Sequence, residues 1–225
     1  MDVELVVVED ADEAAARGAQ LLVDAAAAGE SIFFSGGSTP RRAYELLANA
    51  DDDWSRAQAW WGDDRAVPPD DDRSNFKLVQ DSLLSRLSRS PAAVHRIRGE
   101  LGAEAAADEY DRLLQGVSPG LVLLGIGPDG HTASLFPDAP SLSVTVRRVV
   151  AAEAGLEPFV PRITLTLPAI AHASQVVFLA VGTEKAGPVA RAFGAPPSPD
   201  TPSSLARSRS GTTTVIVDRA AASLL

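Results

Sequence analysis

The stretch "LVLLGIGPDGHTASLFP", residues 121–137, places a glycine-rich turn and a histidine directly after a short apolar run. A continuous apolar run of this length is typical of a strand buried on both faces of a parallel sheet. In sheets of that kind, ligands bind at the loops that follow the carboxyl ends of the strands. The stretch therefore predicts an α/β fold with a functional loop that begins at Gly125.

The glycines of this loop fit two kinds of site. Residues 125–130 spell G-x-G-x-x-G, which is the dinucleotide-binding pattern, and Glu153 follows at a distance expected of a ribose-binding acid. A dinucleotide site, however, needs a full helix packed on the sheet after the last glycine. Pro137 and Pro140 stop any helix after about one turn, and Pro128 removes an N–H group from the turn itself. A catalytic loop is the favoured interpretation.

The rest of the chain alternates between apolar runs and alanine- and leucine-rich stretches with helical spacing. Strands are predicted at Val3–Val8, Ile32–Phe34, Ala59–Trp61, Val94–Ile97, Leu121–Leu124, Val149–Ala152, Ile163–Leu165, Val176–Val181 and Thr213–Val217. Helices are predicted at Asp12–Ala28, Pro40–Asn49, Asn75–Leu87, Ala103–Leu114 and Lys185–Phe193. This alternation predicts a mostly parallel sheet covered by helices on both faces, within one domain that spans residues 1–225.

Composition restricts the classes of function. The 225 residues are 45% hydrophobic and 22% charged, and no apolar run approaches the roughly 20 residues that cross a membrane. A net charge of −10 argues against nucleic-acid binding, which needs a basic surface. The absence of cysteine excludes disulfides and thiolate metal sites. Because Met1–Glu4 is acidic, we expect no secretory leader and a cytoplasmic protein.

Two further kinds of segment are predicted to lie at the surface of the fold. The proline- and serine-rich segment Ala195–Ser204 predicts a mobile surface loop. The acidic runs Asp51–Asp53 and Asp70–Asp72 are expected in solvated turns, because neither has the spacing of a calcium-binding loop.

The segment "FSGGSTP", residues 34–40, runs from a predicted strand into a predicted helix. Gly36 and Gly37 permit a tight turn that exposes successive N–H groups, and Ser38 and Thr39 add hydroxyl donors. Pro40 suits the first turn of a helix. Since helix N-termini of this kind attract anions, the segment predicts a phosphate site, against the simpler alternative of a turn with no ligand.

The segment "WWGDDRAV", residues 60–67, carries Asp63, Asp64 and Arg65 past the end of another predicted strand. Taken alone, these residues are more typical of a surface ion pair. Their expected place at the same edge of the sheet as the "SGGSTP" loop favours a contact between Arg65 and ligand.

His131 is the candidate general base. Imidazole titrates near neutral pH, so it can take a proton from water and return it later. Asp129 lies two residues earlier and is placed to orient the ring or stabilise its charged form, in the manner of an acid that supports a catalytic histidine. Asp63 is the alternative supporting acid. A structural histidine that caps a short helix is the competing interpretation.

Two more cations are candidates for phosphate binding. Arg162 precedes a predicted strand, and Lys185 follows another strand and begins a helix. A cation in the first turn of a helix opposes the helix dipole, which favours a ligand as the reason for Lys185 over an exposed surface position.

Five segments resemble, in order and spacing, the motifs of the glucosamine-6-phosphate isomerase/6-phosphogluconolactonase family, and within it those of the lactonases. They are "SGGSTP", "WWGDDRAVPPDDDRSN", "GIGPDGHTASLFP", "PRITLTLPAI" and "VGTEK". The resemblance implies a three-layer α/β/α Rossmann-like domain, shared with glucosamine-6-phosphate deaminase and ribose-5-phosphate isomerase. It implies hydrolysis of 6-phospho-D-glucono-1,5-lactone, the second step of the oxidative pentose phosphate pathway, without metal or cofactor. One departure is visible, because Asp64 stands where the family usually has glutamate.

Two other functions remain as alternatives. Glucosamine-6-phosphate deaminases resemble this chain but carry an Asn-Glu-Pro segment after the histidine, where this chain has Thr132–Pro137. A sugar-phosphate-sensing domain would bind without turnover and predicts a DNA-binding segment that this acidic chain lacks. The expected partner is a phosphorylated sugar lactone, with no nucleic acid and no membrane. The sequence leaves the oligomeric state open, and we favour a monomer.

Overall fold

The computed structural model describes residues 3–48, 50 and 52–225. Its strands are β1 (Val3–Val8), β2 (Ser31–Phe34), β3 (Gln58–Trp61), β4 (Asp63–Arg65), β5 (Ala93–Val94), β6 (Leu121–Leu124), β7 (Val149–Ala152), β8 (Arg162–Leu165), β9 (Gln175–Ala180) and β10 (Thr212–Asp218). Its α-helices are α1 (Ala11–Ala28), α2 (Ser38–Leu47), α3 (Asn75–Ser82), α4 (Ala103–Leu113), α5 (Leu167–Ala171) and α6 (Ala186–Phe193). Short 3₁₀ turns are η1 (Leu84–Arg86), η2 (Gly99–Leu101), η3 (Pro140–Ser143), η4 (Thr183–Lys185) and η5 (Pro202–Ser204).

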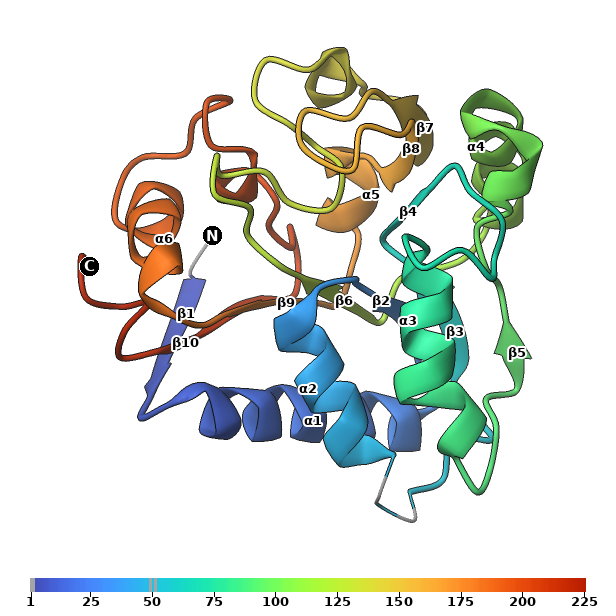
Figure 1. The fold of residues 1–225 in the computed structure, drawn as a ribbon, viewed down its shortest axis with the longest axis horizontal. Helices are drawn as coiled ribbons and strands as arrows, with labels where there is room; N and C mark the ends of the chain where they lie inside the picture. Colours follow the sequence, from blue (N-terminus) through green and yellow to red (C-terminus); the bar gives the residue numbers. More distant parts are fainter. Residues whose placement is uncertain (1–2, 49, 51) are drawn as a thin grey trace.

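The centre of the protein is a parallel sheet. Among the described residues it has seven strands in the order β1-β10-β9-β6-β2-β3-β5, and each neighbouring pair is parallel. Helices α1, α2 and α3 lie on one side of it, and α4, α5 and α6 lie on the other (Figure 1). All the residues of β6 are buried, as expected for a strand covered on both faces. The predicted three-layer α/β/α fold is therefore confirmed.

Helix α1 shows how local sequence sets the elements. At its start, the Asp10 side chain accepts a hydrogen bond from Glu13 N (2.9 Å), while the Glu13 carboxylate accepts one from Glu9 N (2.8 Å). At its end, Gly29 adopts φ 76°, a left-handed conformation that glycine takes at no steric cost. In the part of the chain that the structure describes, neither α1 nor any other helix is long and apolar enough to span a membrane.

Two predicted strands lie outside the central sheet. Val149–Ala152 and Ile163–Leu165 form β7 and β8, which pair antiparallel with each other, and β4 adds to β8 as a third antiparallel strand. The short connection between them explains why they pair antiparallel, as a mostly parallel architecture allows. Residues 153–161 contain no helix and are fewer than the dozen or more residues that a parallel crossover needs.

Some boundaries also differ from those predicted. The run Val94–Ile97 pairs only as the short β5, and Asn75–Leu87 divides into α3 and η1. Helix α2 ends at Leu47, and Asn49 and Asp51 lie outside the described residues. The expected mobile loop Ala195–Ser204 is exposed only in its first half, because its last residues are buried and form η5.

Buried tyrosines fix the carboxyl ends of β2 and β3. The hydroxyl of Tyr44, on α2, donates to Ser35 O (2.9 Å) and accepts from Ser35 N (3.1 Å). The hydroxyl of Tyr110, on α4, donates to Trp61 O (3.2 Å) and accepts from Trp61 N (2.8 Å). These hydroxyls satisfy backbone groups at the points where the chain leaves the sheet, so the loops that follow start from fixed positions.

Candidate active site

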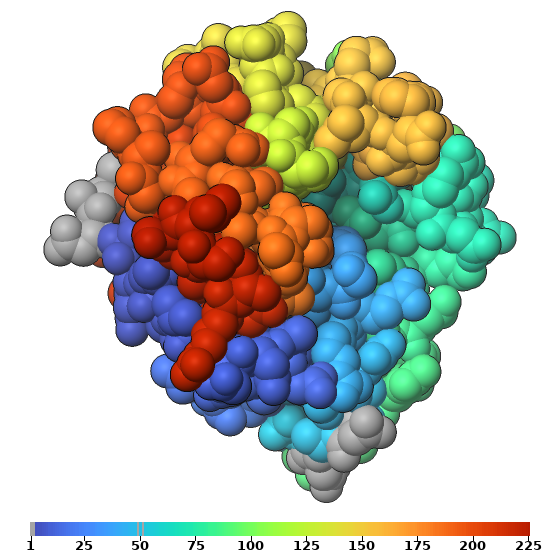
Figure 2. All heavy atoms as spheres, turned by 60° about the vertical axis from the view of Figure 1, so that its left-hand side comes forward, coloured from blue at the N-terminus to red at the C-terminus, as the bar shows by residue number. Residues whose placement is uncertain are grey.

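The loops after β2, β3, β6 and β9 meet at one edge of the central sheet and enclose a cleft of about 330 Å³. Figure 2 shows the hollow where α2, the loop of residues 125–137 and the segment before β8 come together. Every predicted site residue except Asp129 lines this cleft, and Asp129 contacts a residue that does. The anion-binding segment and the histidine, far apart in the sequence, thus face the same space.

The loop after β6 is closed by its own backbone. Gly127 N donates to His131 O (2.8 Å), and the Thr132 hydroxyl donates to Gly125 O (2.8 Å). Gly130 adopts φ 93°, a conformation that side chains other than glycine rarely take. The residues after His131 form a turn rather than a helix, so the histidine does not cap a short helix.

His131 and Asp129 form a close pair in this loop. His131 Nδ1 lies 2.5 Å from the Asp129 carboxylate, which also accepts from His131 N (3.0 Å). The imidazole is partly exposed, with 21% of its side-chain surface accessible. Since Nδ1 is held by the carboxylate, Nε2 is the nitrogen that remains for proton transfer. Of the two candidate acids, Asp129 is therefore the one that contacts the imidazole in this structure.

The loop after β2 leads into the N-terminus of α2. Gly37 is the residue that precedes the helix, with φ 105°, and no side chain caps the helix there. The N–H groups of the first turn, which includes Ser38 and Thr39, are therefore free of side-chain caps, and both residues line the cleft. Gly36 lines the cleft as well. This geometry matches a helix N-terminus that receives an anion.

Arg65 and Arg162 stand directly opposite each other on β4 and β8. Arg162 is 4% exposed and donates through Nη2 to the carbonyls of Pro158 (2.8 Å) and Leu156 (3.4 Å), while Arg65 Nη1 donates to Arg73 O. Burial, and after it the Arg65 guanidinium, lowers the pKa of Arg162. Two like charges at the wall of a cleft favour an anion between or beside them.

Lys185 lines the cleft and contacts the loop of His131. Its Nζ donates to Ile126 O (2.8 Å) and so uses one of its three donors. Arg191, on α6, donates to Pro128 O (2.9 Å). Ser203, in the segment expected to be mobile, donates its N–H group to Gly130 O (3.0 Å). We call residues 125–137 the histidine loop. Three of its carbonyls, those of Ile126, Pro128 and Gly130, thus accept hydrogen bonds from the C-terminal part of the chain.

Asp63 and Asp64 both accept hydrogen bonds from Asn75, Asp63 from its side chain and Asp64 from its backbone. The Asp63 carboxylate accepts from Ser134 Oγ (2.6 Å) and Asn75 Nδ2 (3.1 Å), neither of which belongs to the imidazole. The Asp64 carboxylate accepts from the N–H groups of Asn75 (2.6 Å) and Phe76 (3.0 Å) at the start of α3. Burial raises the pKa of Asp64 to about 6, although these hydrogen bonds act in the opposite direction. Asp64 does not line the cleft, so this shorter acid serves as a cap for α3.

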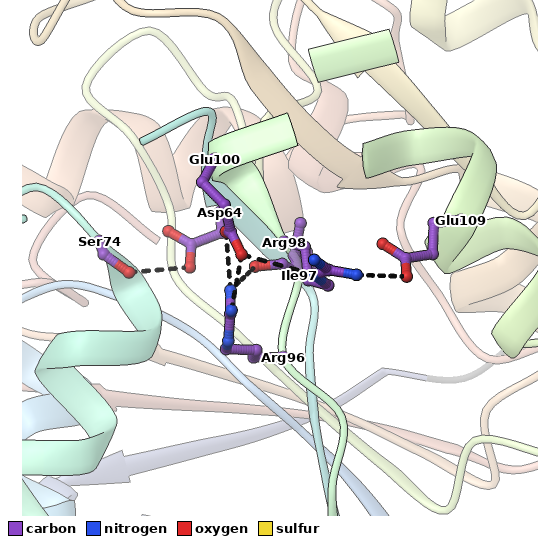
Figure 3. A network of polar contacts seen from close by, with 7 residues as sticks. All are labelled: Asp64, Ser74, Arg96, Ile97, Arg98, Glu100 and Glu109. Atoms are coloured by element: carbon purple, nitrogen blue, oxygen red, sulfur yellow. Dashed lines mark hydrogen bonds and ion pairs between the residues drawn. The ribbon is translucent and has the colours of Figure 1, made fainter. Parts of the chain in front are cut away.

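Figure 3 shows Asp64, which accepts from Ser74 Oγ (3.1 Å), and the ion pairs of Arg96 and Arg98 that lie near it. Arg96 donates to both carboxylate oxygens of Glu100 (2.8 and 2.7 Å). Arg98 contacts Glu100 (3.5 Å) in η2 and Glu109 (3.2 Å) on α4. The network joins the segment after β5 to α4 behind the cleft.

Several cleft residues were not singled out from the sequence. Asn75 and Ser134 line the cleft as polar side chains, and Phe136 packs against the imidazole with ring centroids 4.6 Å apart. Glu157 and Glu184 add carboxylates to the wall. No spacing in the sequence marks Asn75, because its partners lie in other loops. Ser134 had a weak signal, since it belongs to the same glycine-rich segment as His131. In the described part of the chain, no three His, Asp or Glu side chains gather as a metal-binding cluster.

The fold and the cleft define an α/β protein with a histidine–aspartate pair, several cationic side chains and an uncapped helix N-terminus at the carboxyl edge of a parallel sheet. Residues 8–215 match the family described as glucosamine-6-phosphate isomerases/6-phosphogluconolactonase, and the chain belongs to this family. It is 36% identical to the 6-phosphogluconolactonase of Streptomyces coelicolor, over 96% of this chain and 90% of that protein.

Solved structures show the same fold. The structure of 6-phosphogluconolactonase from Trypanosoma brucei superposes with a TM-score of 0.87 at 26% identity and covers 100% of this chain and 99% of that one. A monomeric glucosamine-6-phosphate deaminase superposes with a TM-score of 0.88 at 20% identity, covering 99% of this chain and 100% of that one. At that identity the second likeness shows the fold alone, so the fold does not separate the two activities.

Proposed function

We propose that this protein hydrolyses 6-phospho-D-glucono-1,5-lactone to 6-phospho-D-gluconate, the second step of the oxidative pentose phosphate pathway. The observation that carries the proposal is the His131–Asp129 pair, which faces the same cleft as the uncapped N-terminus of α2. The named lactonase relative supports the choice of substrate. A cytoplasmic place and a single domain follow as parts of the same proposal.

The phosphate binds at the segment Gly36–Thr39. The free N–H groups at the start of α2 and the hydroxyls of Ser38 and Thr39 are its donors. Arg162 and Lys185, which line the same cleft, supply positive charge. The local cations offset the repulsion that an anion meets from a chain with a net charge of −10.

His131 activates the water. Its Nε2 takes a proton as the water oxygen attacks the lactone carbonyl carbon, and Asp129 stabilises the imidazolium that forms. Arg65 or N–H groups of the loop hold the negative charge that develops on the carbonyl oxygen. The bond from the carbonyl carbon to the ring oxygen then breaks, and the imidazolium returns its proton to that oxygen. The product is the open-chain acid, and no covalent enzyme intermediate is needed.

The direct test is lactone hydrolysis by the purified protein, followed by pH-stat and compared with the spontaneous rate. Glucosamine 6-phosphate is assayed in parallel for release of ammonia. The proposal predicts acid release from the phosphorylated lactone and no ammonia. Ammonia release without lactone turnover assigns the deaminase activity instead, and binding of both sugars without turnover of either indicates a sensing domain.

A further inference from the structure

Three buried side chains form a continuous polar bridge along the cleft. Ser134 Oγ donates to Asp63 Oδ2 (2.6 Å), and Asn75 Nδ2 donates to Asp63 Oδ1 (3.1 Å) and to Asp63 O (2.9 Å). Ser134, Asp63 and Asn75 are 1%, 6% and 2% exposed, so these hydrogen bonds are shielded from water. We call these residues the Ser134–Asp63–Asn75 bridge.

The bridge joins the two loops that the proposed function requires. Ser134 lies three residues after His131 in the loop that follows β6. At the other end, the Asn75 side chain packs on Gly36, where an added Cβ would lie only 2.0 Å from Asn75 Oδ1. All of these residues line the cleft. The bridge therefore runs from the anion-binding segment to the loop of the imidazole.

The Asp63 carboxylate is fully engaged in this bridge. Each of its oxygens accepts a hydrogen bond from a different element, one from the histidine loop and one from α3. The imidazole has its own carboxylate, Asp129, at 2.5 Å. A proton-transfer role for Asp63 would require it to give up buried partners, whereas a structural link uses both of them as they stand.

We propose that Asp63 is a positioning residue, which acts through Ser134 and Asn75 to fix the spacing between the Gly36–Thr39 segment and His131. The inference rests on the proposed function, because it explains how a substrate held at one loop is presented to a base on another. A displacement of about 1 Å between such groups is enough to lower turnover about 10²-fold.

The chemistry of the bridge distinguishes this role from acid–base catalysis. In Asp63→Asn, the amide oxygen accepts from Asn75 Nδ2, and the amide nitrogen donates to Ser134 Oγ, which is able to accept. Both links survive, but the group can no longer exchange a proton near neutral pH. In Asp63→Ala, both side-chain links are lost. A catalytic carboxylate fails in both variants, and a positioning one fails only in the second.

The experiment measures kcat and KM for the phosphorylated lactone, with pH profiles, in the wild type, Asp63→Asn and Asp63→Ala. We expect the asparagine variant to keep a kcat of the wild-type order and the same pH profile. We expect the alanine variant to lose about 10²-fold in kcat/KM. Ser134→Ala removes one link only, so its kcat/KM should lie between those of the two Asp63 variants. It replaces Asp63→Ala in the comparison if that variant does not fold.

Asp111→Ala is the matched control. The Asp111 carboxylate also accepts two hydrogen bonds, from Arg148 N (2.7 Å) and Val149 N (3.0 Å), but it does not line the cleft. The Asp111→Ala variant should have a lower melting temperature than the wild type and unchanged kcat and KM. Equal losses in Asp63→Asn and Asp63→Ala would overturn the proposal, and so would full activity in Asp63→Ala.

A readout without substrate separates this inference from the proposed function. Crystal structures of the two Asp63 variants report the separation of Gly36 and His131 directly. We expect it to be kept in Asp63→Asn and changed in Asp63→Ala. An unchanged separation in Asp63→Ala would refute the bridge, whereas a wild type that does not hydrolyse the lactone refutes the proposed function alone.

Discussion

Gly127→Ala should displace the imidazole without disturbing the rest of the cleft. The backbone at Gly127 does not have a positive φ, so alanine fits its conformation. The added Cβ, however, would lie 2.0 Å from both Cε1 and Nδ1 of His131, where ordinary contact begins at 3.4 Å. The ring or the backbone must withdraw by 1.4 Å to restore an ordinary contact.

The withdrawal breaks the link between the imidazole and its carboxylate. The His131 Nδ1 to Asp129 distance of 2.5 Å leaves no room for a shift of that size while the hydrogen bond is kept. A misplaced general base loses most of its effect, so we expect kcat to fall about 10²-fold. KM should change little, because the groups proposed to bind phosphate lie on other loops. Lactone hydrolysis by pH-stat, over a range of substrate concentrations, gives both constants.

The control is Gly187→Ala on α6, where the added Cβ would be 3.5 Å from Arg191 Nη1, an ordinary contact. Both variants are compared by thermal melting, so that a loss of folded protein is not mistaken for a loss of turnover. Wild-type kcat in Gly127→Ala would refute the reasoning, because it would show that the position of the ring does not limit the reaction.

Three other changes test separate parts of the structure. Tyr44→Phe leaves the N–H and C=O of Ser35 without their buried partner, so chemical denaturation should show a loss of about 1–3 kcal/mol in the free energy of unfolding; an unchanged value would mean that the hydroxyl is replaceable by water. Arg96 holds the pKa of Glu100 at about 2, below its ordinary 4.5. That pair stabilises the fold above pH 4.5 and is lost as the pH falls to about 2, so Glu100→Gln should lower the melting temperature at pH 7 and match the wild type near pH 2; a difference independent of pH would contradict this. Lys185→Met should raise KM more for the phosphorylated lactone than for unphosphorylated gluconolactone, and equal effects on both lactones would mean that Lys185 acts through its bond to Ile126 O and not on the phosphate.

Much of the fold was predictable because its signals are local. Apolar runs such as Leu121–Leu124 gave the central strands, and Gly29 and the Asp10 cap delimit α1. The antiparallel β7 and β8 have the same apolar character as the parallel strands, so only the length of the connection between them distinguished the two arrangements. The second half of Ala195–Ser204 was mispredicted, because composition does not reveal that Ser203 supports the histidine loop.

The candidate site also has residues that the sequence predicts and residues that it does not. His131, Asp129 and the Gly36–Thr39 segment lie in glycine-rich loops, where residue type and position after a strand point to chemistry. Asn75 shows what sequence reasoning misses, since its partners Asp63 and Gly36 come from different loops. The role of Asp64 was also beyond prediction, because the bonds that it accepts at the start of α3 appear only when β4 and α3 meet.

The measurement that tests the central claim most directly is pH-stat hydrolysis of 6-phosphogluconolactone by the wild type and by His131→Asn. The claim is that an imidazole and an anion site act together in one cleft. It predicts rapid hydrolysis by the wild type, a fall in kcat of about 10²–10⁴-fold in the variant, and little change in KM. Full turnover by His131→Asn, above the spontaneous rate, would contradict it.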